Sequence, residues 1–135
     1  MPDNHFQYCS DCLPPAAADV YFQALMREID WRQDKLKLDG REHAIPRLHQ
    51  WYADAGISYS WSGIEMTPLS WIPPLSRLRE ELQQSTGHVF NSVLANLYRD
   101  GSDSMGWHAD DEPELGSEPV IASISLGAER DFQIR

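Results

Sequence analysis

The chain of 135 residues is long enough for one domain with a buried core, and its 41% hydrophobic and 24% charged residues are typical of a globular protein. No run approaches the roughly 20 consecutive apolar residues of a transmembrane helix, and residues 1–6 lack the basic and apolar parts of a signal peptide. The sequence therefore predicts an intracellular protein, and its net charge of −10 disfavours nucleic-acid binding, which usually needs a basic surface.

Residues 1–14 are predicted to form a loose lead-in that contains both cysteines of the chain, Cys9 and Cys12. A lone CxxC lacks the second ligand pair of a zinc site, and no predicted strand precedes it as in a redox motif. We therefore expect two reduced thiols without a special role.

The middle of the chain alternates between helical and extended patterns. Apolar residues at helical spacing predict one helix at 16–30, opened by two prolines, and a second at 73–86, stopped by Gly87. Runs of β-branched and aromatic residues predict the remaining extended segments of this part. These are strands at 35–38 and 44–51 around an Asp39-Gly40 turn, and a strand region at 56–66.

From Val89 onward the pattern has period two, which predicts a strand. Leu94, Asn96 and Tyr98 share one face of it, and polar groups beside a leucine indicate a face that lines a pocket. After a polar loop at 100–118, further strands are predicted at 120–126 and 131–135. The whole is an α+β protein with helices on one side of a mainly antiparallel sheet.

The segment Trp107-His108-Ala109-Asp110 places an imidazole and a carboxylate two residues apart. In extended backbone both side chains point the same way and can reach one metal ion. Two His and one carboxylate on one face of the ion is the arrangement of non-haem Fe(II) oxygenases. Taken alone the pair is a weak signal, because a loop His bonded to a neighbouring Asp has the same spacing.

The order of motifs around this pair resembles the AlkB family of Fe(II)/2-oxoglutarate dioxygenases. The resemblance covers roughly residues 20–135, and 90–132 is its specific part. It is carried by Asn91-Ser92-Val93-Leu94-Ala95-Asn96-Leu97-Tyr98-Arg99-Asp100-Gly101, by Trp107-His108-Ala109-Asp110-Asp111-Glu112, and by the run from Pro119 to Phe132, with Ile45-Pro46-Arg47-Leu48 and Tyr59-Ser60-Trp61-Ser62-Gly63 upstream. It implies a double-stranded β-helix (jelly-roll) core within residues 15–135, with N-terminal helices on one face.

The resemblance also assigns roles to particular residues. His108 and Asp110 match the first two iron ligands of the family, and Asn96 and Tyr98 match the strand residues that bind 2-oxoglutarate. Leu94, Ser123 and Phe132 match its pocket lining. Trp61 matches the aromatic that stacks on a flipped-out base against His108, Tyr59, Ser62 and Glu112 match positions at the base edge, and Arg47 matches one near the base or backbone. For Leu94, Ser123 and Phe132 ordinary packing is the alternative.

The sequence departs from the family pattern downstream, where a second metal His and an Arg for the distal carboxylate of 2-oxoglutarate are required. No His follows His108, and Arg130 and Arg135 lie too close to the preceding strands to be that Arg. We therefore expect a polypeptide that is incomplete at its C-terminus, marginally folded and a poor catalyst by itself. The net charge of −10 would then be that of only part of a protein.

The expected function is oxidative dealkylation of N-alkylated bases in DNA or RNA, with Fe(II) as cofactor and 2-oxoglutarate and O₂ as co-substrates. The stretch 86–92 most resembles the homologue that prefers single strands. We expect a cytoplasmic monomer, or a nuclear one in a eukaryote. Two alternatives remain open: a dioxygenase with a non-nucleic-acid substrate, which the acidic charge would suit, and a non-catalytic binding module that keeps the His–Asp pair.

Overall fold

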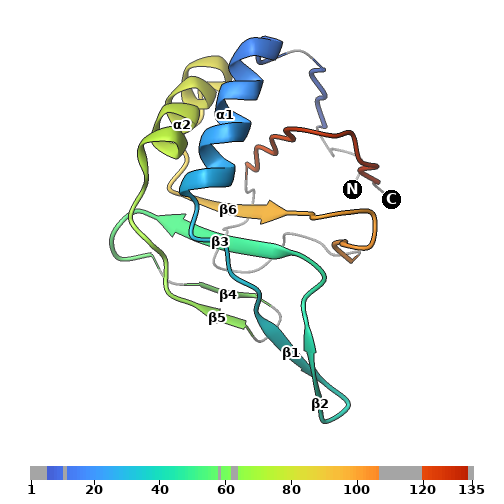
Figure 1. Cartoon of the computed structure of the whole chain (residues 1–135). Helices are drawn as coiled ribbons and strands as arrows, with labels where there is room; N and C mark the ends of the chain where they lie inside the picture. Colours follow the sequence, from blue (N-terminus) through green and yellow to red (C-terminus); the bar gives the residue numbers. More distant parts are fainter. Residues whose placement is uncertain (1–5, 11, 58, 62–63, 107–119, 134–135) are drawn as a thin grey trace.

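The computed structural model describes residues 6–10, 12–57, 59–61, 64–106 and 120–133, with the side chains of all of these except 59–61 and 64–66. Within these residues, one helix is followed by five short strands, a second helix and a sixth strand (Figure 1). They are α1 (Pro15–Glu28), β1 (Lys35–Leu38), β2 (Arg41–Ala44), β3 (Leu48–Ala53), β4 (Tyr59–Trp61), β5 (Ile64–Met66), α2 (Pro73–Thr86) and β6 (Ser92–Leu97). All strand pairs are antiparallel, in three two-stranded sheets.

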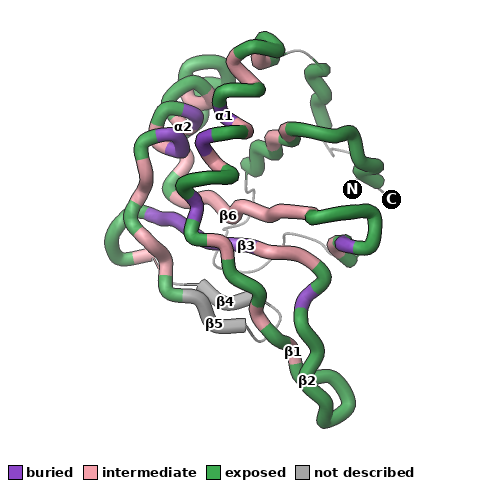
Figure 2. Tube along the Cα trace, in the orientation of Figure 1, coloured by how far each residue is buried: buried purple, intermediate pink, exposed green. Residues whose placement is uncertain are grey.

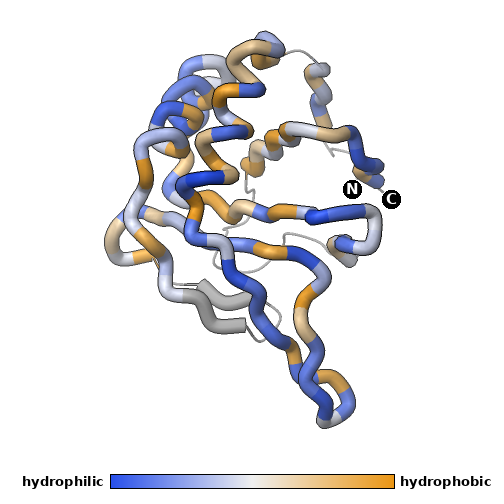
Figure 3. Tube along the Cα trace, in the orientation of Figure 1, coloured by the Kyte–Doolittle hydropathy of each residue, from blue (hydrophilic) through white to orange (hydrophobic). Residues whose placement is uncertain are grey.

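Both predicted helices are confirmed. α1 begins with Pro15, whose fixed φ suits the first helical turn, and ends where Ile29 turns extended, at φ −71° and ψ 134°. α2 has the predicted bounds because Gly87 takes a left-handed φ of 76° and donates its N–H to the carbonyl of Gln83 at 2.9 Å. Figure 3 shows apolar and polar residues alternating along α1. In the part of the chain that is described, neither helix is long and apolar enough to span a membrane.

The β1–β2 hairpin extends away from the body of the molecule and is almost entirely exposed (Figure 2). Its two-residue loop is the predicted turn: Asp39 and Gly40 both have positive φ, 52° and 75°, as the favoured hairpin turn requires. The prediction of a single strand at 44–51 is wrong, because β2 ends at Ala44 and β3 starts at Leu48. Pro46 between them has no N–H to donate to a ladder.

The central sheet is the β3–β6 pair, which has a core on each of its faces. Towards the helices, Tyr52 packs with Ile29 and Leu75, and Val93 and Ala95 join them. On the opposite face, Trp51 packs with Ile45, Ala53 and Leu94. The predicted alternation of β6 is therefore confirmed, and the face that carries Leu94 and Asn96 points away from the helices.

The region 56–66 contains two strands, since β4 and β5 pair with each other in the register Tyr59↔Met66 and Trp61↔Ile64. The strands predicted at 120–126 and 131–135 are not formed: residues 120–133 adopt no strand, and 134–135 lie outside the described residues. A strand needs a hydrogen-bonded neighbour, and this segment pairs with none of the described strands. Instead Gly127 packs so closely on α1 that an added Cβ would come within 2.8 Å of the Phe22 ring.

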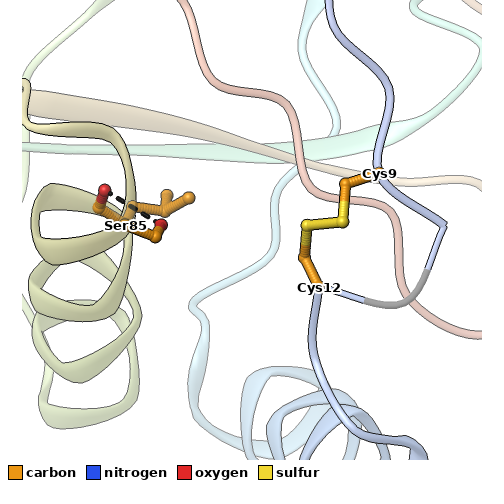
Figure 4. Close-up of a disulfide and its surroundings, with 4 residues drawn as sticks. Cys9, Cys12 and Ser85 are labelled. Atoms are coloured by element: carbon orange, nitrogen blue, oxygen red, sulfur yellow. Dashed lines mark hydrogen bonds between the residues drawn. A yellow bond between two sulfur atoms is a disulfide. The ribbon is translucent and has the colours of Figure 1, made fainter.

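The prediction of reduced thiols at Cys9 and Cys12 is also wrong. The two cysteines form a disulfide, with their Cα atoms 5.7 Å apart (Figure 4). That separation lies within the usual disulfide range, because the chain turns at Ser10 between them. Sequence spacing alone did not show this turn.

Candidate functional site

The structure describes one part of the predicted site. His108, Asp110 and Glu112 lie outside the described residues, as does Ser62. Tyr59 and Trp61 belong to β4, but their side chains are not described. Among the described residues, no three His, Cys, Asp or Glu side chains come together as a metal site. The part that can be analysed is therefore the predicted 2-oxoglutarate set together with Arg47.

Asn96 lies near the end of β6, directly opposite His49 of β3 and on the same face as Leu94. Its side-chain Oδ1 is buried and has no hydrogen-bond partner among the described residues. Leaving a buried polar atom unpaired costs free energy, so we expect the Asn96 Oδ1 to bind a partner beyond the described residues, such as a water molecule or a ligand. Leu94 next to it packs against the Trp51 cluster, which gives it a structural role whatever else it does.

Arg47 and Tyr98 flank the same end of the β3–β6 pair. Because Leu48 pairs with Leu97, Arg47 just before β3 and Tyr98 just after β6 lie side by side beyond the last pair of the ladder. Arg47 donates from NH1 to the Ser104 carbonyl at 3.2 Å, while its buried Nε has no partner among the described residues. Burial lowers the pKa of the Arg47 guanidinium, and the nearby Tyr98 phenol opposes that shift. The structure thus brings Arg47, Asn96 and Tyr98 together.

Ser123 and Phe132 lie on the C-terminal segment and are not brought to this cluster. Ser123 is exposed. Phe132 is 68% exposed, and its ring stacks on Phe6 of the lead-in with the centroids 6.2 Å apart. In this structure neither residue lines a pocket beside Asn96.

Sequence reasoning predicted a polar loop from residue 100 but missed the contacts that hold its first turn. Asp103 is the only buried acid among the described residues, and it accepts hydrogen bonds from the backbone N, Nε and NH2 of Arg99 at 2.8 to 3.0 Å. The side-chain hydrogen bond from Arg99 lowers the pKa of Asp103 to about 2. Arg130 donates to the backbone carbonyls of Asp100 and Asp103. The four-residue spacing of Arg99 and Asp103 was the only sequence signal.

His49 was a second omission. It is 3% exposed, and its Nε2 is hydrogen-bonded to the carboxylate of Asp34, which also pairs with Arg32. Burial opposes the charge of Asp34, but the hydrogen bonds from Arg32 and His49 outweigh it, so the pKa of Asp34 is lowered. A satisfied polar group therefore lies directly across the sheet from the unsatisfied Asn96.

Comparison with known proteins gives consistent matches. Residues 5–135 match the 2OG-Fe(II) oxygenase superfamily. The chain is 43% identical over 123 residues to "DNA oxidative demethylase ALKBH2" of Mus musculus, which covers 89% of this chain and 52% of that protein. It is 44% identical over 118 residues to "Alpha-ketoglutarate-dependent dioxygenase alkB homolog 3" of Bos taurus, covering 87% and 41%. A protein of Arabidopsis thaliana that is also named "DNA oxidative demethylase ALKBH2" is 36% identical over 132 residues. The chain spans about half the length of these relatives.

Proposed function

The chain belongs to the 2OG-Fe(II) oxygenase superfamily, and from this premise we propose that it is part of an AlkB-type dioxygenase that oxidatively removes alkyl groups from DNA or RNA bases. The relatives named DNA oxidative demethylase support this reaction class, and they confirm the predicted resemblance to the AlkB family. Fe(II) is the proposed cofactor, with 2-oxoglutarate and O₂ as co-substrates. The proposed core within 15–135 is a jelly roll in which β3 and β6 are neighbouring strands.

The observation that carries this proposal is the unpartnered end of the Asn96 amide. An amide group can turn to present either its oxygen or its NH₂, so a buried amide end can donate to a carboxylate oxygen. The buried Nε of Arg47, also without a partner among the described residues, is a second donor at the same end of the sheet. These groups fit a small dicarboxylate such as 2-oxoglutarate.

The proposed metal ligands are His108 and Asp110, which the sequence places ten residues and more beyond Tyr98. Bound Fe(II), with 2-oxoglutarate and O₂, supplies the oxidising power that hydroxylates an N-alkyl carbon. Asn96 and Tyr98 orient the co-substrate by hydrogen bonds to its carboxylates, with Leu94 as a proposed wall. Holding the reacting groups in one geometry is the main contribution of the protein to such a reaction.

The proposed substrate residues are aromatic and polar. Enzymes that modify a base inside a nucleic acid must extrude it and hold it between flat side chains. Trp61, with His108 on the other side, takes this role, and stacking on an aromatic contributes about 1–3 kcal/mol per base. Base-edge and backbone contacts are proposed for Tyr59, Ser62, Glu112 and Arg47.

Replacing Asn96 tests the co-substrate site directly. Asn96→Leu keeps the side-chain size but removes the amide, so we expect 2-oxoglutarate to bind at least about tenfold more weakly, since losing a hydrogen bond to a charged group costs about 1.5–3 kcal/mol. The measurement is anaerobic calorimetric titration of the chain with 2-oxoglutarate in the presence of Fe(II).

Asn91→Leu is the matched control, because Asn91 is an exposed residue of the same type just before β6. The affinity of Asn91→Leu for 2-oxoglutarate should equal that of the parent chain. Equal affinities in Asn96→Leu and the parent would remove Asn96 from the site. A parent chain that does not bind 2-oxoglutarate would overturn the proposed function itself.

The projecting β1–β2 hairpin supports a nucleic-acid substrate despite the acidic total. It carries three basic side chains, Lys35, Lys37 and Arg41, against two acidic ones, Asp39 and Glu42, and all five are exposed. A basic element on an acidic protein concentrates its attraction for phosphates at one place. We propose single-stranded DNA or RNA as the partner, bound by a monomer inside the cell.

Neutralising this hairpin should weaken binding to an oligonucleotide. For Lys35→Gln/Lys37→Gln/Arg41→Gln, we expect the slope of log affinity against log salt concentration to become shallower by about 2, at roughly 0.7 per lost single-strand phosphate contact. Fluorescence anisotropy with a methylated single-stranded oligonucleotide at several salt concentrations measures this. Arg27→Gln, an exposed change on α1, should leave the slope unchanged. A parent chain whose binding does not depend on salt would favour the non-nucleic-acid alternative.

A further inference from the structure

We infer that Arg130 is a positioning residue that holds Tyr98, and the turn that follows it, in place for the 2-oxoglutarate site. The expected effect on 2-oxoglutarate binding rests on the proposed function, whereas the contacts of Arg130 do not. The family resemblance assigns no role to Arg130, whose position in the sequence excludes it as the Arg that pairs with the distal carboxylate of 2-oxoglutarate.

One guanidinium makes three contacts with the segment 98–103. NH1 donates to the Asp100 carbonyl at 3.1 Å, and NH2 donates to the Asp103 carbonyl at 2.5 Å. The Cζ atom lies 4.3 Å from the centroid of the Tyr98 ring, within cation–π range. The planar group therefore fixes two backbone carbonyls and one aromatic ring relative to each other.

The other supports of this turn use different groups, except at the Asp100 carbonyl, which also accepts the N–H of Asp103 at 3.2 Å. Arg99 occupies the carboxylate of Asp103, not its carbonyl. Arg47 binds the Ser104 carbonyl, and Ser104 donates its N–H to Pro46 at 2.7 Å. These contacts anchor the turn to itself and to the residues before β3. Arg130 adds the link from the turn to the ring of Tyr98 and to the C-terminal segment.

The C-terminal segment is itself held in two other places, so Arg130 is presented from a fixed backbone. Gly127, at a φ of 86°, packs against Phe22 of α1, and Phe132 stacks on Phe6. Arg130 lies between these two anchors. The segment 120–133 thus contributes to the site through Arg130, although its predicted strands are absent.

Only the shape of arginine satisfies all three contacts together. A guanidinium offers several N–H groups in one plane and stacks flat on a ring, whereas an ammonium is a compact charge without a plane. Arg130→Lys keeps the charge but cannot bind both carbonyls while lying over Tyr98. We therefore expect Arg130→Lys to rescue little of what Arg130→Gln loses.

The test combines backbone exchange with co-substrate binding in the 135-residue chain. In Arg130→Gln, amide hydrogen exchange at 98–104 should become faster while exchange in α2 stays unchanged. The affinity for 2-oxoglutarate, measured with Fe(II) present, should fall about tenfold, the equivalent of about 1.4 kcal/mol. Arg130→Lys should resemble Arg130→Gln in both readouts.

Arg79→Gln is the matched control. Arg79 makes the same kinds of contact elsewhere, with its Cζ 3.9 Å from the Trp71 ring centroid and NH1 bonded to the Phe90 carbonyl and to Asp54. If Arg130 has a merely structural role, Arg130→Gln and Arg79→Gln should both lower the unfolding midpoint, and the two variants should have the same affinity for 2-oxoglutarate. Unchanged exchange at 98–104, or unchanged affinity despite faster exchange, overturns the inference. If the parent chain does not bind 2-oxoglutarate, the proposed function has failed, and exchange alone then decides whether Arg130 holds Tyr98 and the turn.

Discussion

Fe(II) binding is expected to fall more than about a hundredfold in both His108→Ala and Asp110→Ala. Removing even an outer partner of a metal ligand costs about 10–100-fold in affinity, and a direct ligand costs more. These two residues are the only protein ligands that the AlkB resemblance places within the 135 residues, since no His follows His108. Losing either one leaves a single protein ligand. Anaerobic titration with Fe(II), in the presence of 2-oxoglutarate, measures the affinity of each variant.

Two controls separate coordination from a general effect of charge. Asp111→Ala removes the same charge one residue further along, where the side chain would point the opposite way in extended backbone. His43→Ala removes an exposed imidazole from β2. Both should bind Fe(II) as the parent does. If His108→Ala and Asp110→Ala also keep the parent affinity, the pair is not a metal site, and a non-catalytic binding module becomes the better account of the chain.

Local signals predicted the elements that depend on neighbours in sequence. Pro15 has a fixed φ and Gly87 tolerates a left-handed φ, and they mark the start of α1 and the end of α2 as observed. The Asp39-Gly40 turn depends on two residues that tolerate positive φ, and the structure has it there. The alternation of β6 correctly predicted that Asn96 and Leu94 share a face.

Signals that depend on a distant partner failed. An apolar run at 120–126 has the composition of a strand, but composition does not supply the neighbouring strand that a ladder needs. The Cys9–Cys12 disulfide was missed for a different reason: the cysteines are three residues apart in sequence, but their spacing does not show the turn that brings their Cα atoms within 5.7 Å. The prediction of a strand at 44–51 was wrong for a local reason, because Pro46 within this range lacks the N–H that a strand ladder needs.

The candidate site shows the same division. Asn96 was found from its position on an alternating strand and from the family resemblance. Arg130 was missed because its contacts with Asp100 and Asp103 join residues about thirty positions apart, and no periodicity relates them. A residue that supports a site from a distant part of the sequence is identified only from the structure, whereas a residue within a motif can be identified from the sequence.

Trp51 is the residue on which stability should depend most. It is 2% exposed at the centre of β3 and packs with Ile45 and Ala53, directly opposite Leu94 of β6. This cluster is the core of the face that also carries Asn96, two residues along β6 from Leu94. A cavity at Trp51 would therefore open beneath the proposed co-substrate site.

Trp51→Ala is expected to lower the free energy of unfolding by about 3–5 kcal/mol, because the change removes a large buried ring and leaves a cavity that a well-packed sheet cannot fill. Native domains are stable by only about 5–15 kcal/mol, so much of the chain should be unfolded at modest denaturant concentrations. Urea unfolding followed by far-UV circular dichroism measures the change. Trp51→Phe should lose less, since it keeps part of the ring volume, and Val89→Ala, at an 86% exposed residue, should stay within about 0.5 kcal/mol of the parent. A loss below about 1 kcal/mol in Trp51→Ala would show that this face of the β3–β6 pair is not a packed core, and the position of Asn96 would then lack the support on which the proposed site depends.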